Sequence, residues 1–179
     1  MEQSYISDDV FEQIKDFDDY YYCLTKEQKL LIDKLIPNEE LKQRYKDYGL
    51  CKGCKQPNTD YRSWCQLCNS KRFQQNFKNW TSGNSDVDKL IQESQLNAKS
   101  RDEKLEWIEY DRFENIEYIT KGGFGKVYKA KWKDGYIQSW NYEINQWKRS
   151  RIYDGLVALK SLNNSKDITS EFLNEVILQ

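Results

Sequence analysis

Apolar residues recur at helical spacing in the first third of the chain, between polar residues that are suited to cap helices. Thr25 and Gln28 form the pattern of a capping box, and Asn38 can cap a second helix that Gly49 ends. The expected apolar stripes are Leu30, Leu31 and Leu35 in the first helix, and Leu41, Tyr45 and Tyr48 in the second. The pattern therefore predicts a helical hairpin over residues 23–49.

The last third of the chain alternates with the period of two that is typical of β-strands. A glycine-rich stretch at 122–125 separates two such strands, and residues 155–160 form a third. Within the strand that follows the glycines, one face holds Tyr128, Ala130 and Trp132, and the other holds Val127, Lys129 and Lys131. In the third strand, Leu156, Ala158 and Lys160 share a face. Residues 169–177 then have the pattern of a helix, so the fold class is predicted to be α+β.

Three further segments have weaker patterns. Residues 1–22 are acidic and are predicted to be a disordered tail. Residues 81–104 begin as a linker and are predicted to continue as a helix that bridges two modules. An aromatic insertion between Trp132 and Gly155 fits a helix and a strand equally well. We expect this insertion to pack on the neighbouring strands, with an aromatic recognition surface as the alternative.

Four of the five cysteines form two Cys-x-x-Cys pairs that are separated by ten residues. Zinc binds four soft ligands in a tetrahedron, and each pair can present two of them. The chain contains no histidine, so such a site must consist of cysteines alone. Two disulfides or four unrelated thiols are the alternatives. Residues 50–80 are therefore predicted to be a zinc-binding segment, with the ligands Cys51, Cys54, Cys65 and Cys68.

The zinc-binding segment is also locally basic, and it ends in an expected helix with the apolar stripe Phe73, Phe77 and Trp80. A surface for nucleic acid or for an acidic partner is one interpretation of this charge. We instead expect the basic residues to compensate the thiolates and to be solvated. The net charge of −1 over 179 residues excludes a globally basic nucleic-acid binder.

The order of three motifs resembles the small lobe of a eukaryotic protein kinase. These motifs are the glycine-rich loop, the Val-Ala-Leu-Lys strand that ends at Lys160, and the Glu-Phe-x-x-Glu-Val helix that starts at Glu171. The residues in these motifs are similar to those of the tyrosine-kinase-like group. The whole chain is similar to an expanded fungal family in which a cysteine-rich segment precedes the kinase. The resemblance covers residues 105–179 and implies an incomplete small lobe, made of an antiparallel sheet and the αC helix, after a small helical and zinc-binding module.

The resemblance implies an ATP site at this lobe. Lys160 would hold the α- and β-phosphates, and Glu175 would orient Lys160 as its ion-pair partner, with Glu171 as the rival. Thr120 occupies the place of the first glycine of the loop. Phe124 would cap the tip of the loop, and the remaining implied nucleotide-binding residues are Ile119, Gly122, Gly123, Gly125, Val127 and Ala158.

The implied function is the amino-terminal fragment of an ATP-dependent protein kinase of Ser/Thr or dual specificity. The His-Arg-Asp and Asp-Phe-Gly motifs are absent, so this fragment is predicted to be inactive on its own, and Mg²⁺ would bind only in a full-length kinase. The alternative is a non-catalytic zinc-containing interaction module or a truncated pseudokinase-like product.

The expected partners are ATP and protein substrates in a complete kinase, and a protein partner at the zinc-binding and helical module. Nucleic acid and membrane are not expected as partners. The longest aliphatic run, Leu30-Leu31-Ile32, is far shorter than a membrane span, and the amino terminus lacks the pattern of a secretory signal. Paired cysteines suit a reducing compartment, so the expected location is intracellular and cytoplasmic.

Overall fold

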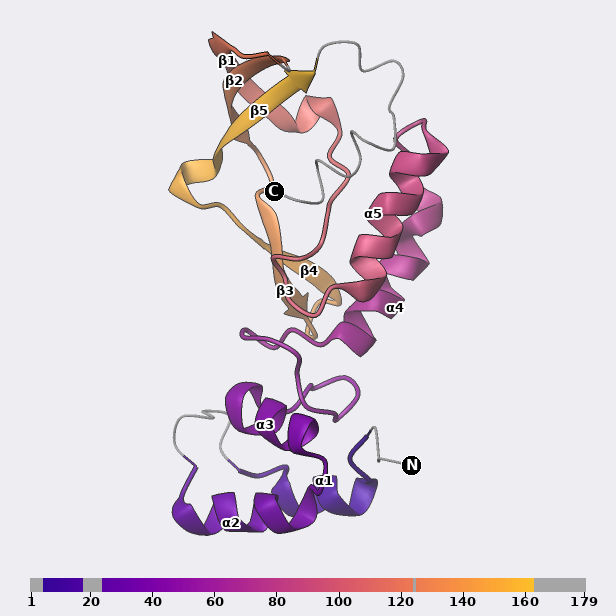
Figure 1. Cartoon of the computed structure of the whole chain (residues 1–179), viewed down its shortest axis with the longest axis vertical. Coiled ribbons are helices and arrows are strands. Elements are labelled where there is room, and N and C mark those ends of the chain that lie inside the picture. The colour runs from indigo at the N-terminus through magenta and orange to yellow at the C-terminus, as the bar shows by residue number, and fades with distance from the viewer. Residues whose placement is uncertain (1–4, 18–23, 124, 163–179) are drawn as a thin grey trace.

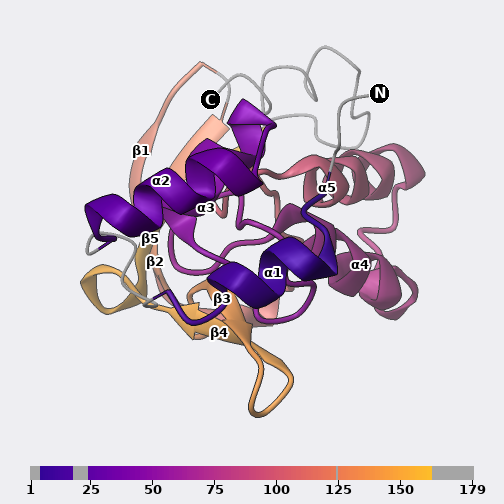
Figure 2. The ribbon, with the colours of Figure 1, turned by 90° about the horizontal axis from the view of Figure 1, so that it is seen from below.

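The fold is described from a computed structural model, in which residues 5–17, 24–123 and 125–162 are described. These residues form five α-helices and two antiparallel sheets, so the α+β class is confirmed (Figure 1). The helices α1 to α3 lie at one end of the molecule, and the larger sheet lies at the other (Figure 1). Figure 2, seen from the α1–α3 end, shows α4 and α5 on one side and the strands on the other.

Helix α1 (Asp8–Ile14) is part of the folded protein, whereas the sequence predicted a disordered tail over 1–22. Ser7 caps the helix by accepting a hydrogen bond from the backbone N–H of Val10. Ile6 and Ile14 are buried against α2 and α3, with Val10 packed beside them. The acidic residues of this segment occupy the solvent side, so the high charge concealed a helix whose apolar residues are spaced by four.

Helices α2 (Lys26–Leu35) and α3 (Glu39–Tyr48) form the expected pair. The capping box of Thr25 and Gln28 is present with both of its hydrogen bonds, and Asn38 accepts from the backbone N–H of Leu41. Gly49 ends α3 with a φ of 65°. The stripe expected for the first helix was wrong at Leu30, which is 70% exposed, because the helix instead buries Ile32.

Helix α4 (Gln66–Asn76) continues into a short 3₁₀ turn, Phe77–Asn79, and packs beside α5 (Ser85–Asn97). The expected stripe of α4 is buried at Phe73 and partly buried at Phe77, whereas Trp80 lies beyond the helix and contacts the Phe77 ring edge-on. The fully buried Trp64 donates its indole N–H to the carbonyl of Ala98, just after α5. This bond fixes the end of α5 against the segment that leads into α4.

The larger sheet has the strand order β1 (Phe113–Lys121), β2 (Gly125–Trp132), β5 (Leu156–Leu162), and each pairing is antiparallel. Two register shifts interrupt the β1–β2 pairing. The β2–β5 pairing runs without interruption from Gly125 opposite Leu162 to Lys131 opposite Leu156. The helix expected over 169–177, which includes Glu175, lies outside the described residues.

The insertion forms a separate antiparallel hairpin of β3 (Tyr136–Asn141) and β4 (Gln146–Ser150). We expected it to pack on the neighbouring strands, but its aromatic side chains pack on the cysteine-containing segment instead. The Trp147 ring stacks on Phe73 with centroids 4.6 Å apart, and Ile137 is buried in the same core as Trp64. The physical reason is that Trp64 and Phe73 offer this hairpin a ready-made apolar surface.

An ion-pair network, nearly buried at Lys104 and Glu106, fixes the base of this hairpin. The carboxylate of Glu106 lies 3.0 Å from the Lys104 ammonium and 2.9 Å from the Arg149 guanidinium. The same carboxylate accepts a hydrogen bond from the backbone N–H of Ile137. These contacts orient β3 and β4 relative to the segment that follows α5.

Candidate functional site

The first cysteine pair lies on a tight turn that follows α3. The backbone N–H of Cys51 donates to the carbonyl of Gln56, and the N–H of Lys55 donates to the carbonyl of Cys51. Lys55 adopts a φ of 63°, which lets the chain reverse directly after Cys54. The N–H of Gly53 points at the Cys51 sulfur, with the two atoms 3.4 Å apart. This geometry directs both sulfur atoms of the pair to the same side of the turn.

The second cysteine pair lies at the beginning of α4. Cys65 is the N-cap residue, and Cys68 lies in the first turn of the helix. The amino terminus of a helix carries a partial positive charge, which stabilises a thiolate. Helix α4 also has no acidic residue in its first turn to oppose this effect. The helix therefore supplies two sulfur atoms and a field that favours their ionised form.

The four predicted ligands come together in space. The Sγ atoms of Cys51, Cys54, Cys65 and Cys68 all lie within 4.8 Å of one another and could hold a metal ion. The distances are 3.7 Å from Cys51 Sγ to Cys68 Sγ and 3.6 Å from Cys54 Sγ to Cys65 Sγ. All four are free thiols, and the alternative of disulfides within the pairs is absent from the described residues. Cys23 lies outside those residues.

The close approach of the thiols changes their acidity. Hydrogen bonds from Cys54 and the other two thiols lower the pKa of Cys51, because they stabilise its thiolate. Hydrogen bonds to Cys51, Cys54 and Cys68 raise the pKa of Cys65, because they stabilise its protonated form, and burial and the charge of Cys51 add to this effect. A cluster of this kind ionises completely when a cation replaces the protons.

Tyr142, from the hairpin, completes the surroundings of the cysteine cluster. Its hydroxyl oxygen lies 3.2 Å from Cys51 Sγ, and its ring borders Gly53, where an added Cβ would lie 3.1 Å from the Tyr142 Cε1 atom. Burial, followed by the hydrogen bond to Cys51, raises the pKa of Tyr142. Sequence reasoning missed this residue because no local spacing signal links it to the cysteines.

The implied nucleotide-binding residues lie mainly on the β1–β2 turn and on one face of the larger sheet. Val127 is directly opposite Lys160, Ala158 is opposite Lys129, and Thr120 is opposite Val127. Directly opposite residues in a sheet share a face, so the register places Val127, Ala158 and Lys160 on the same face. Ala158 and Lys160 are exposed on that face.

The glycine turn at the end of this face is open. The N–H of Gly122 donates to the carbonyl of Gly125, which closes the turn between β1 and β2. A Cβ added at Gly123 would meet no atom within 4 Å, so a ligand can approach the backbone there. Ile119 is exposed at the entry to the turn. Phe124 and Glu175 lie outside the described residues, so their implied roles stay predictions.

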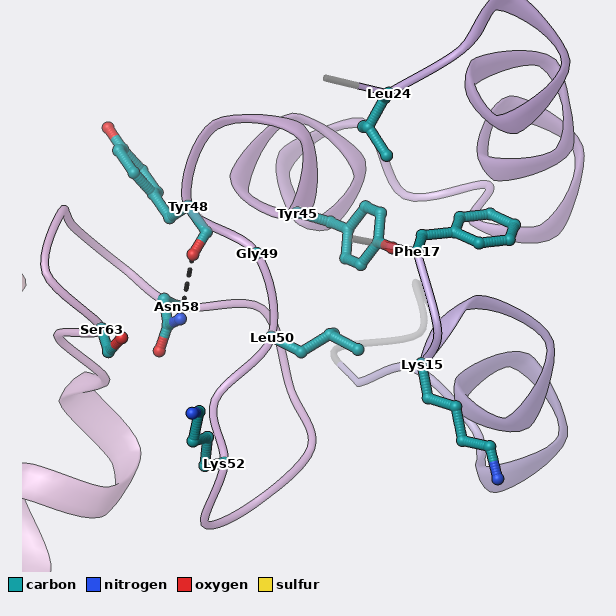
Figure 3. A pocket seen from close by; sticks show the side chains of 10 residues that line it. All are labelled: Lys15, Phe17, Leu24, Tyr45, Tyr48, Gly49, Leu50, Lys52, Asn58 and Ser63. Carbon is teal, nitrogen blue, oxygen red and sulfur yellow. Dashed lines mark hydrogen bonds between the residues drawn. The ribbon is translucent and has the colours of Figure 1, made fainter. Parts of the chain in front are cut away.

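A small pocket of about 160 Å³ lies between the helical module and the cysteine turn (Figure 3). Tyr45, Phe17 and Leu50 form part of its wall. At one side the buried Asn58 donates from Nδ2 to the carbonyl of Tyr48, as the dashed line in Figure 3 marks. The pocket contains none of the cysteine ligands or residues of the sheet face.

No protein-family model, curated protein or solved structure matches this chain. In the part of the chain that the structure describes, no helix is both long enough and apolar enough to cross a membrane.

Proposed function

We propose that this chain is the amino-terminal part of an ATP-dependent protein kinase, in which a zinc-stabilised module precedes a nucleotide-binding small lobe. The observation that carries the proposal is the register of β2 and β5. It puts Val127, Ala158 and Lys160 on one face of the sheet, next to an open glycine turn. These are the residues that the resemblance to protein kinases assigns to adenine and phosphate.

The chemistry of this face suits a nucleotide. Val127 and Ala158 offer a small apolar platform for a flat base, and the Lys160 ammonium can neutralise phosphate charge. Backbone N–H groups of a glycine turn can approach phosphate oxygens closely because no side chain intervenes. Only one side of a cleft is present in the described residues, so we expect weak nucleotide binding by this chain alone.

The proposed metal is zinc, and its proposed role is structural. A tetrahedral zinc ion with Zn–S bonds of about 2.3 Å separates its sulfur ligands by about 3.8 Å. The sulfur distances of 3.6 and 3.7 Å support this geometry. Four cysteine ligands leave no open coordination position for substrate, which is typical of structural sites. The bound ion would join the turn that follows α3 to the start of α4.

A non-catalytic interaction module is the second candidate. The hairpin packs on the cysteine-containing core and places Tyr142 against Cys51. In sequence, however, the hairpin lies between the two strands of the proposed nucleotide face. This arrangement favours a role in which the metal centre and the hairpin form one recognition unit. Nucleotide binding at the sheet face separates the two candidates.

The nucleotide proposal is tested by adding magnesium–ATP to the 179-residue chain and following amide chemical shifts, which detect weak binding. We expect changes at Thr120–Gly125, Val127 and Ala158, and we expect Lys160→Met to abolish them. Lys126→Met is the matched control, because Lys126 lies opposite Ser161 on the other face of the same strand pair. Shift changes that persist in Lys160→Met, or that occur only elsewhere, would place the nucleotide site away from this face.

A further inference from the structure

A groove of about 740 Å³ lies between α4 and the β3–β4 hairpin, directly beside the cysteine cluster. Helix α4 contributes Lys71, Arg72 and Gln75 to its walls, and the hairpin contributes Trp140, Tyr142 and Gln146. None of the residues that line the groove is acidic. No sequence pattern links these two sets of residues, because they are far apart in the chain and only the docking of the hairpin brings them together.

The charge around the groove is positive. Residues 51–80 contain six lysine and arginine residues and a single acidic residue, Asp60, in a chain whose net charge is −1. Four thiolates that hold a divalent cation would leave this segment net positive. Lys71 is exposed at the groove, where its ammonium is available to a polyanion. The segment that supplies one wall of the groove is therefore locally positive, and Lys71 and Arg72 bring that charge to the groove itself.

The aromatic side chains of the groove are held in place before any ligand arrives. The Arg72 guanidinium lies 4.4 Å from the centroid of the Trp140 ring and 5.0 Å from that of Tyr142, and it donates to the side-chain oxygen of Asn69. Trp140 also packs edge-on against Trp147 at a centroid distance of 5.0 Å. Trp140 and Tyr142 are only partly buried, so aromatic surface remains available in the groove.

We propose that this groove binds single-stranded nucleic acid. Partly exposed aromatic rings beside an arginine provide stacking surfaces for unpaired bases, and lysine neutralises the backbone phosphates. Side-chain amides at Gln75 and Gln146 carry both donors and acceptors, which match the edges of bases. An acidic peptide would use the positive charge but would leave the aromatic rings and amides without a role. This inference goes beyond the proposed kinase function and does not depend on it. It replaces the sequence-based expectation that nucleic acid is not a partner, because the docked hairpin places aromatic rings beside the basic residues of α4.

The proposal is tested with the full 179-residue chain loaded with zinc, by fluorescence anisotropy. The probes are fluorescein-labelled RNA and DNA single strands of the same mixed sequence, about 12 nucleotides long. The salt concentration is about 50 mM, because phosphate contacts weaken steeply as salt rises. We expect both strands to bind. Unlabelled single strands should compete better than polyglutamate or than a DNA duplex of the same sequence. A difference between the two strands would reveal contacts to the 2′-hydroxyl.

Matched variants locate the binding. Gln75→Glu puts a negative charge into the groove and should weaken binding several-fold, whereas Gln74→Glu changes the adjacent exposed residue of α4 outside the groove and should not. Lys71→Ala should lower the slope of log Kd against log salt by about one, and Lys78→Ala, outside the groove, should leave it unchanged. Trp140→Ala should weaken binding at least about fivefold through the loss of stacking.

Zinc content and circular dichroism verify that Trp140→Ala is folded, and the glutamine pair tests the groove even if that variant is not. Three results would overturn the proposal: no binding at low salt, equal competition by polyglutamate, or equal effects of Gln75→Glu and Gln74→Glu. Equal competition by polyglutamate would indicate a surface for acidic proteins. A failure of nucleotide binding at Lys160 would not change the binding of single strands to the groove, so the two proposals fail independently.

Discussion

Cys51 is a buried cysteine ligand with two contacts from outside the ligand set. It is buried, its sulfur receives the N–H of Gly53, and it lies within hydrogen-bond distance of the Tyr142 hydroxyl. Hydrogen bonds of this kind from outside the ligand set orient metal ligands and tune their charge. Cys51, whose thiol has a lowered pKa, therefore also receives contacts from outside the ligand set.

The zinc proposal makes a prediction at this scale. Purified protein should contain about one zinc ion per chain, because four clustered thiolates form one closed tetrahedral site. The double substitution Cys51→Ser and Cys65→Ser should remove the ion and destabilise residues 50–80, as measured by metal analysis and circular dichroism. Cys23→Ser, which removes a thiol outside both pairs, is the control and should retain the zinc. A metal-free wild-type protein with this segment folded would contradict the proposal.

Helix α1 is the element whose contribution to the fold is easiest to measure. Ile14 at its end is fully buried, and the Tyr45 hydroxyl of α3 donates to the Ile14 carbonyl at 3.0 Å. The helix is too short to be stable alone, so its stability comes from this packing. Residues 5–17 therefore belong to the same cooperative unit as α2 and α3.

Ile14→Ala should lower the free energy of unfolding by about 2–4 kcal/mol, because it removes buried methyl groups and leaves a cavity. Gln13→Ala changes an exposed neighbour and should alter this free energy by less than about 0.5 kcal/mol. Urea denaturation followed by circular dichroism measures both. Equal stability of the two variants would show that the amino-terminal segment is a dispensable tail.

The elements differ in how far the sequence alone could predict them. Thr25, Asn38 and Gly49 act on backbone groups within a few residues, so the ends of α2 and α3 were predictable from local chemistry. The burial of Ile32 in place of Leu30 depends on the direction from which α1 and α3 approach, which no local pattern contains. For the same reason the four cysteines could be predicted from spacing, whereas Tyr142 could not.

At the scale of the whole molecule, the hairpin joins the two halves of the chain. It departs from β2 and returns to β5, yet its aromatic residues complete the core that contains Trp64 and Phe73. The metal centre touches the same hairpin through Tyr142. Order at the cysteine cluster and order in the β3–β4 hairpin are therefore coupled.

Removal of zinc should consequently loosen a segment that supplies none of the ligands. After chelation, we expect amide hydrogen exchange to accelerate over 136–150, while α2, which packs in the separate α1–α3 core, should change much less. Hydrogen exchange is followed by mass spectrometry with and without chelator, and in each sample the hairpin is compared with α2. Unchanged protection of the hairpin in fully zinc-free protein would show that the two are independent.

The docking of Trp147 on Phe73 also has a consequence for synthesis on the ribosome. The chain emerges from its amino terminus, so the surface around Trp64 and Phe73 is complete before β4 has been made. At ordinary rates of elongation, this aromatic surface stays exposed on the order of ten seconds before the hairpin is synthesised. During that interval the nascent chain exposes an apolar surface to which chaperones and other nascent chains can bind. The arrival of the hairpin thus ends the exposure of this aromatic surface on the nascent chain.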